Sequence, residues 1–165
     1  MLLFMVVFVA IDQVTKYLVL DLLKPIGTVE IIPGLLNFSY VENRGAAFGM
    51  LQNMTTILSV VTAISCLIIL YLLFAYRNHD FLSYAACVLI AAGGIGNLVD
   101  RILRGFVVDF ISVSFFPPVF NFADCCVTVG VVFALAHLLR LEMRHKKKKD
   151  AETDGQTDSH CGAGE

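Results

Sequence analysis

The sequence predicts an all-α membrane protein with four transmembrane helices, a small extracytoplasmic β-cradle and a short interfacial segment. Hydrophobic residues make up 58% of the 165 residues, and charged residues only 16%. Soluble domains average about 45–50% apolar and about 25% charged residues. The apolar residues also gather in runs that approach the roughly 20 residues that a helix needs to cross a bilayer. Composition and run length together exclude an ordinary soluble domain.

The four spans are predicted over residues 1–23, within 45–76, over 81–99 and over 119–139. Residues 45–76 contain no Asp, Glu, Lys or Arg, and only residues 77–80 separate this run from the next, which predicts a tight helical hairpin. Eleven residues precede Asp12, which is short for a first span. That span is therefore expected either to continue past Lys16 to Leu23 or to begin upstream of Met1.

Basic residues predict the orientation, because the cytoplasmic loops of membrane proteins carry an excess of Lys and Arg. Six of the twelve Lys and Arg residues crowd into residues 140–149, directly after the last apolar run. This run places both termini in the cytoplasm and the loops 24–44 and 100–118 outside. A lysine run can also bind nucleic acid, but beside an apolar segment it indicates a membrane boundary, so we expect no nucleic-acid partner.

The chain divides into a four-span transmembrane domain, residues 1–145, and a polar tail, residues 146–165. The tail is nearly devoid of large apolar residues, so we expect it to be a disordered cytoplasmic segment.

The two outer loops have different patterns. Residues 28–41 form two β-prone runs around Pro33-Gly34, which predicts a small sheet resting on the membrane surface. Residues 106–116 are dense in aromatic and β-branched residues and end at Pro117-Pro118, which prevent a helix from running straight into the last span. We expect this second stretch to lie in the interface, where it can also cover a site.

Charged residues in or beside apolar spans are costly and by default indicate function. Asp12 and Lys16 lie four residues apart with the acid first, which is the favourable order for an ion pair on a helix. We expect this pair to face the bundle and to stabilise or orient its neighbours. Asp124 lies near the outer end of the last span, where a helix N-terminus favours a carboxylate, and Asp109 lies in the preceding outer loop.

Asp109 and Asp124 are therefore on the same side of the membrane and form a candidate catalytic pair. Two close carboxylates share one proton, because both cannot ionise cheaply. The ionised member can activate water while the protonated member polarises an amide carbonyl. This is aspartyl-protease chemistry and needs no metal or cofactor. The same carboxylates also fit a polytopic membrane transporter or a proton-relay protein, and a packing scaffold without chemistry is a third possibility.

Five short motifs follow one another along the chain: DQVTK at 12–16, NRGAAF at 43–48, GGIGNLVDR at 93–101, VVDF at 107–110 and FNFAD at 120–124. In content and order they resemble the lipoprotein signal peptidase (signal peptidase II) family. The resemblance implies an aspartyl endopeptidase that removes signal peptides from diacylglyceryl-modified bacterial prolipoproteins, cutting just before the lipidated cysteine. It also implies a multi-pass protein of the bacterial cytoplasmic (inner) membrane that contacts membrane lipids and whose active site is at the outer face. We expect a monomer.

The resemblance further implies that Asp109 and Asp124 are catalytic and that four other polar residues line the site and bind substrate: Asn43, Asn97, Arg101 and Asn121. Asn43 begins a turn-like Asn-Arg-Gly and can hold the substrate backbone.

The residues themselves leave alternatives open at two of these four positions and at the glycines of the third span. Arg101, which shares a helix face with Asn97, either grips substrate carbonyls with its forked donors or pairs with Asp12 or Asp100. Asn121 either contacts substrate or caps the last helix and orients Asp124. The glycines of the third span allow close approach of either another helix or the substrate; they are Gly93, Gly94 and Gly96.

Overall fold

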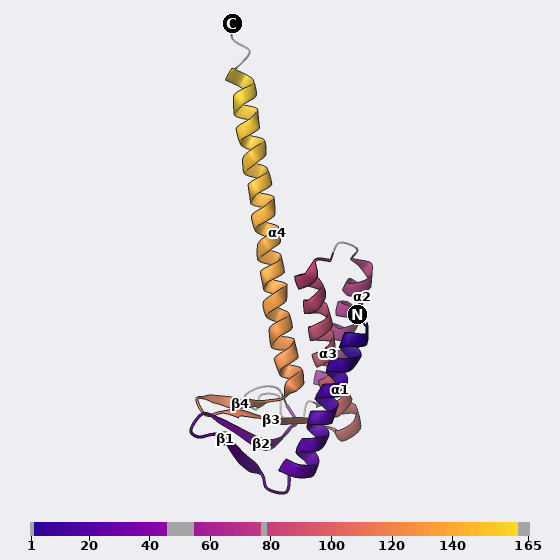
Figure 1. The fold of residues 1–165 in the computed structure, drawn as a ribbon. Helices are drawn as coiled ribbons and strands as arrows, with labels where there is room; N and C mark the ends of the chain where they lie inside the picture. The colour runs from indigo at the N-terminus through magenta and orange to yellow at the C-terminus, as the bar shows by residue number, and fades with distance from the viewer. Residues whose placement is uncertain (1, 46–54, 77–78, 162–165) are drawn as a thin grey trace.

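A computed structural model describes residues 2–45, 55–76 and 79–161 of the chain (Figure 1). Within these ranges four helices are long and apolar enough to cross a membrane, which confirms the four predicted spans. α1 covers Leu2–Leu18 and continues as a π-helical turn, η1, over Val19–Leu23. α2 covers Thr55–Ala75, α3 covers Phe81–Arg104 and α4 covers Phe122–Cys161. The first span thus extends past Lys16 to Leu23, one of the two possibilities that the sequence left open.

α3 packs against α1, α2 and α4, and its glycines allow these three helices to come close. A Cβ atom on Gly93 would clash with the backbone carbonyl of Ala123 in α4. A Cβ atom on Gly96 would lie 2.5 Å from a carboxylate oxygen of Asp12 in α1. Gly94 faces α2. Close helix packing is therefore sufficient to explain Gly93 and Gly96.

The outward faces of the helices carry large apolar side chains that no other part of the described chain covers. Leu67 and Phe74 of α2 and Leu103 of α3 are 66%, 67% and 73% exposed. An apolar surface this extensive is unfavourable in water. It fits the lipid environment that the spans require.

The small sheet has four antiparallel strands in the order β1-β2-β3-β4. β1, Thr28–Ile32, and β2, Leu36–Asn43, form the hairpin predicted for the first outer loop. β3, Val107–Val113, and β4, Phe116–Phe120, form a second hairpin. β2 pairs with β3, so the two loops, far apart in the sequence, build one sheet. The sheet lies across one end of the helices, and the start of α1 and the end of α4 lie toward the other (Figure 1).

The second hairpin corrects two predictions. The fold is not all-α, and residues 106–116 are not merely an interfacial segment, since most of them form β3. Their aromatic and β-branched side chains favour a strand, and β2 offers an open edge for pairing. Pro117 and Pro118 lie in β4, an edge strand, where a missing N–H is tolerated.

α4 runs through 40 residues and extends far beyond the other helices toward the C-terminus (Figure 1). Residues 146–161, expected to be disordered, continue this helix. Lys, Ala and Glu are good helix formers, and extending an existing helix avoids the cost of a new nucleus. The division of the chain into a domain over 1–145 and a separate tail stays a prediction.

Candidate active site

Asp109 lies in β3, at the point where the sheet meets the helices. Its side chain is 2% exposed, and both of its carboxylate oxygens accept hydrogen bonds. Asn43, at the end of the neighbouring strand β2, donates from Nδ2 to Oδ2 over 2.8 Å. Asn121, just before α4, donates from Nδ2 to Oδ1 over 2.6 Å. The pairing of β2 with β3 therefore brings Asn43 to Asp109.

Asp124 lies in the first turn of α4 and takes part in its N-terminal cap. The amide N–H of Asp124 donates to Oδ1 of Asn121 over 3.0 Å, and the N–H of Asn121 donates back to Oδ2 of Asp124 over 3.2 Å. This reciprocal pattern is a capping box. The other Asp124 oxygen, Oδ1, accepts from Nδ2 of Asn97 in α3 over 2.8 Å. The sequence left two roles open for Asn121, contact with substrate or capping of the last helix with orientation of Asp124. The structure contains the hydrogen bonds of the second role.

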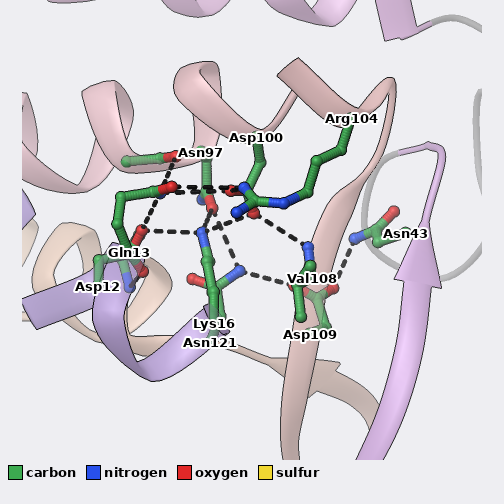
Figure 2. Close-up of polar contacts among 12 residues, drawn as sticks. Asp12, Gln13, Lys16, Asn43, Asn97, Asp100, Arg104, Val108, Asp109 and Asn121 are labelled. Carbon is green, nitrogen blue, oxygen red and sulfur yellow. Dashed lines mark hydrogen bonds and ion pairs between the residues drawn. The ribbon is translucent and has the colours of Figure 1, made fainter. Parts of the chain in front are cut away.

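Asn121 joins the two aspartates directly. Its side-chain amide donates to Asp109 and its backbone amide donates to Asp124. Nδ2 of Asn121 also lies 3.2 Å from Oδ1 of Asn97, which itself contacts Asp124. Asn121 is completely buried. One network thus brings Asp109, Asp124, Asn97, Asn121 and Asn43 together, as Figure 2 shows for most of these side chains.

The environment of Asp109 favours a proton on its carboxyl group. Burial is the main cause and the negative charge of Asp124 the second, and together they raise the pKa of Asp109 to about 6. The hydrogen bonds from Asn43 and Asn121 act in the opposite direction, because they stabilise the charged form. At a pH just below this value the pair holds a proton that an isolated aspartate would have lost.

Arg101 lies beside the carboxylates without forming an ion pair with any residue that the structure describes. It feels the charges of Asp124, Asp109 and Asp100. Asp100 pairs instead with Arg104, one turn further along α3, and with Lys16. The suggested pairing of Arg101 with Asp12 or Asp100 is therefore wrong. The spacing of four residues between Asp100 and Arg104 is the signal that could have identified the true partner.

A cavity of about 410 Å³ lies between α2, α3 and α4 and reaches Asp124. Asn97 and Arg101 line it next to this carboxylate, and most of the remaining wall is apolar or small, including Val61, Ile69 and Val127. The cavity offers space for an extended chain or an apolar group beside the aspartates.

Next to the aspartates lies a group of charged side chains, which we call the buried ion cluster: the buried Asp12, Lys16 and Asp100, together with Arg104, which is 22% exposed. The predicted pair is confirmed, with Lys16 Nζ 2.9 Å from Asp12 Oδ2. The sequence did not predict the additional contact of Lys16 with Asp100 at 3.1 Å, nor the role of Gln13, which donates to Asp12 and to the carbonyl of Gly96. Figure 2 shows the cluster between α1 and α3.

No group of three or more His, Cys, Asp or Glu side chains lies close enough to hold a metal ion among the residues described. The expectation that the chemistry needs no metal or cofactor rests on the carboxylates themselves and stays a prediction.

Comparisons with known proteins show the family to which this chain is similar. The family described as signal peptidase (SPase) II matches residues 4–140. A lipoprotein signal peptidase of Caldanaerobacter subterraneus subsp. tengcongensis is 44% identical over 124 residues, which are 75% of this chain and 85% of that protein. A lipoprotein signal peptidase of Symbiobacterium thermophilum is 42% identical over 142 residues, 84% of this chain and 93% of that protein. A solved bacterial membrane enzyme, determined by the in meso method, has a TM-score of 0.77 at 36% identity and covers 84% of this chain and 87% of its own.

Proposed function

This chain belongs to the signal peptidase II family, and we propose that Asp109 and Asp124 are the catalytic pair with which it removes signal peptides from bacterial prolipoproteins. The observation that carries the assignment is the hydrogen-bonded bridge of Asn121 between two buried carboxylates. A pair of aspartates held this way has the means to share one proton and to act as general base and general acid in turn.

The reaction proceeds through a water molecule and returns the pair to its starting state. The ionised carboxylate removes a proton from water, whose oxygen forms a bond to the carbonyl carbon of the scissile amide. The protonated carboxyl group gives its proton to the carbonyl oxygen, and a neutral tetrahedral intermediate forms. When the carbon–nitrogen bond breaks, the nitrogen takes a proton from the first carboxyl and the hydroxyl oxygen returns one to the second. One proton is again held by the pair.

The side chains around the pair have different proposed roles. Arg101 lines the cavity next to Asp124 and has no partner ion among the described residues, so its guanidinium donors are available for carbonyl groups of an extended substrate. Asn97 and Asn121 are engaged with the aspartates, and we assign them to positioning these carboxylates. Asn43 contacts Asp109 and can also reach the substrate backbone from the sheet side.

The lipid-modified cysteine of a prolipoprotein fits this arrangement. Its acyl chains would remain in the bilayer while the peptide enters beside Asp124, and the mainly apolar cavity between α2, α3 and α4 is open to such a group. Cleavage just before the diacylglyceryl cysteine then follows from where the lipid anchors the chain. Contact with membrane lipids and a monomeric state are part of this proposal.

We further propose that both termini face the cytoplasm and that the sheet and the aspartates face outward. The basic residues at the end of the last span support this orientation. The start of α1 and the end of α4 also lie away from the sheet (Figure 1). A proton relay would need acids through the depth of the membrane, whereas Asp12, Asp100, Asp109 and Asp124 meet at one end of the bundle and α2 has none.

The test is cleavage of a purified diacylglyceryl prolipoprotein by Asp109→Asn and Asp124→Asn in lipid nanodiscs. Each change removes a proton-transfer group, so we expect each to lower kcat by about 10²–10⁴-fold or more. Asp21→Asn, the same change at an exposed position of η1, is the matched control and should cleave normally. Full turnover by either site variant would remove that residue from the pair. Equal cleavage of a precursor without lipid would contradict the lipoprotein specificity.

A further inference from the structure

Two backbone amides, each directly before one of the aspartates, donate to buried carboxylates. The N–H of Val108 donates to Oδ2 of Asp100 over 3.1 Å, and the N–H of Ala123 donates to Oδ1 of Asp12 over 2.9 Å. Val108 precedes Asp109, and Ala123 precedes Asp124. The position of each catalytic residue's backbone is therefore tied to an acid on a different helix.

The ammonium group of Lys16 connects these two acids. Its Nζ lies 2.9 Å from Oδ2 of Asp12 and 3.1 Å from Oδ2 of Asp100, and the third contact, at 2.9 Å, is to Oδ1 of Asn97. An ammonium group has three donors, so all of them are used. Lys16 has no exposed surface, and Figure 2 shows its side chain between α1 and α3 with these contacts as dashed lines.

The third contact reaches the carboxylates through side chains. Because an ammonium group can only donate, Oδ1 of Asn97 must face Lys16, and Nδ2 then faces Asp124, to which it donates over 2.8 Å. Oδ1 of Asn97 also accepts from Asn121, which in turn donates to Asp109. Lys16 is thus linked to both aspartates through backbone and through side-chain amides.

A buried ion cluster of this kind is a costly way to fill a core. Removing charges from water costs several kcal/mol per ion on the scale measured for proteins, and well-packed apolar residues often serve stability equally well. The four charges balance, two from the carboxylates and two from Lys16 and Arg104. What the charges contribute is a defined geometry. The ammonium nitrogen of Lys16 contacts one acid on α1 and one on α3, and these acids hold the backbone at the start of α4 and of β3.

We propose that Lys16 is a positioning residue, which sets the separation and orientation of the Asp109 and Asp124 carboxylates through Asp100, Asp12 and Asn97. This role rests on the proposed function of the two aspartates. Lys16 does not touch the substrate or the reacting atoms. Its contribution is the geometry of the pair and, through its charge, the proton affinity of Asp109.

Groups from several other elements act on Asp109: Asp124 of α4, Asn121 just before it, Asn43 of β2, Arg101 of α3 and Lys16 of α1. The charge of Asp124 raises the pKa of Asp109, whereas the charge of Lys16 lowers it. Replacing Lys16 by an uncharged residue therefore raises that pKa further. A structural filler without a positioning role would not move the pH dependence of the reaction.

The experiment compares Lys16→Met with Lys24→Met, the same change at an exposed lysine, using the full chain in nanodiscs. Hydrogen exchange of the Val108 and Ala123 amides reports the backbone geometry without any reaction. Cleavage of a diacylglyceryl prolipoprotein, followed as a function of pH, reports the catalytic consequence.

In Lys16→Met we expect faster exchange at both amides and a kcat about 100-fold lower, the usual cost of misplacing a catalytic group by about 1 Å. KM should change little, because the lost interaction does not involve substrate binding. The pH at which kcat/KM declines on the basic side should rise. Lys24→Met should match the unmodified protein in all three measurements.

Normal exchange at both amides together with normal kcat in Lys16→Met would overturn the proposal. If Lys16→Met fails to insert into the membrane, Asp100→Asn is measured instead. Hydrogen exchange at the Val108 amide should then become faster, exchange at the Ala123 amide should stay slow, and kcat should fall. If Asp100→Asn changed hydrogen exchange equally at the two amides, or at neither, the inference would again be overturned. Failure of the unmodified protein to cleave would instead refute the proposed function, and the exchange measurements would still test the role of Lys16.

Discussion

Two groups of paired charges in this molecule use the same chemistry in opposite environments. In the buried ion cluster, Lys16 and Asp12 are 0% and 1% exposed and 2.9 Å apart. On the surface of the sheet, Lys24 lies 3.5 Å from Glu42, with exposures of 50% and 31%, and Arg44 also pairs with Glu42. Water screens the second group and competes for its donors. Without water, the first group has a single arrangement that satisfies its charges, so it can hold other parts of the chain in place.

The largest expected effect comes from breaking the buried group. Asp12→Ala leaves Lys16 without one of its partners and frees the N–H of Ala123, and uncoupling a buried pair in this way costs about 3–5 kcal/mol. We expect a loss of this size in the free energy of unfolding, measured by denaturant titration in mixed micelles. Asp21→Ala, an exposed acid on η1, is the control. A loss no larger than that of the control would show that the buried pair does not stabilise the fold.

A smaller effect concerns the proton on the pair. The pKa of Asp109 is raised to about 6, so its carboxyl group stays protonated up to that pH and loses the proton above it. The active form with one proton is then lost as the pH rises, and kcat/KM, which reports the free enzyme, should decline on the basic side near pH 6. The hydrogen bond from Asn43 lowers this pKa, so Asn43→Ala should move the decline to higher pH.

Asn37→Ala makes the same change in the same strand without touching Asp109 and is the matched control. A pH profile that declines at the same value in Asn43→Ala and in the unmodified protein would contradict the electrostatic role of Asn43.

The smallest effect is expected on the sheet surface. Glu42→Ala removes the shared partner of Lys24 and Arg44, but exposed ion pairs of this kind contribute little. We expect no measurable change in the unfolding midpoint and normal cleavage. A loss comparable with that of Asp12→Ala would show that burial is not what distinguishes the two groups.

Local patterns in the sequence predicted a large part of this structure. The lengths of the apolar runs indicated the four spans, and the spacing of Asp12 and Lys16 indicated their ion pair. The position of Asn121 before Asp124 indicated a helix cap. The ion pair and the cap depend on residues within about one helical turn, and each span depends on one continuous apolar run, so patterns within single segments were sufficient.

Other features escaped local reasoning for identifiable reasons. Pro117 and Pro118 indicated an interruption before the last helix, but a strand at the edge of a sheet tolerates them as well. Arg101 adjoins Asp100 in the sequence, but neighbouring residues on a helix do not face each other, so Asp100 pairs with Arg104, four residues further along α3; this local signal was overlooked. The continuation of α4 to Cys161 follows from helix propagation, which composition alone did not suggest.

By itself the sequence determined that four apolar segments cross a membrane and that Asp109 and Asp124 fall at the same end of them, because hydrophobic run length and chain order require no knowledge of packing. Only the tertiary structure decided that β2 pairs with β3, that Asn121 bridges the aspartates and that Lys16 links Asp12 to Asp100. These contacts join residues far apart along the chain. Their geometry depends on how closely the helices approach and on excluding water from the charges, and neither is encoded in any short segment.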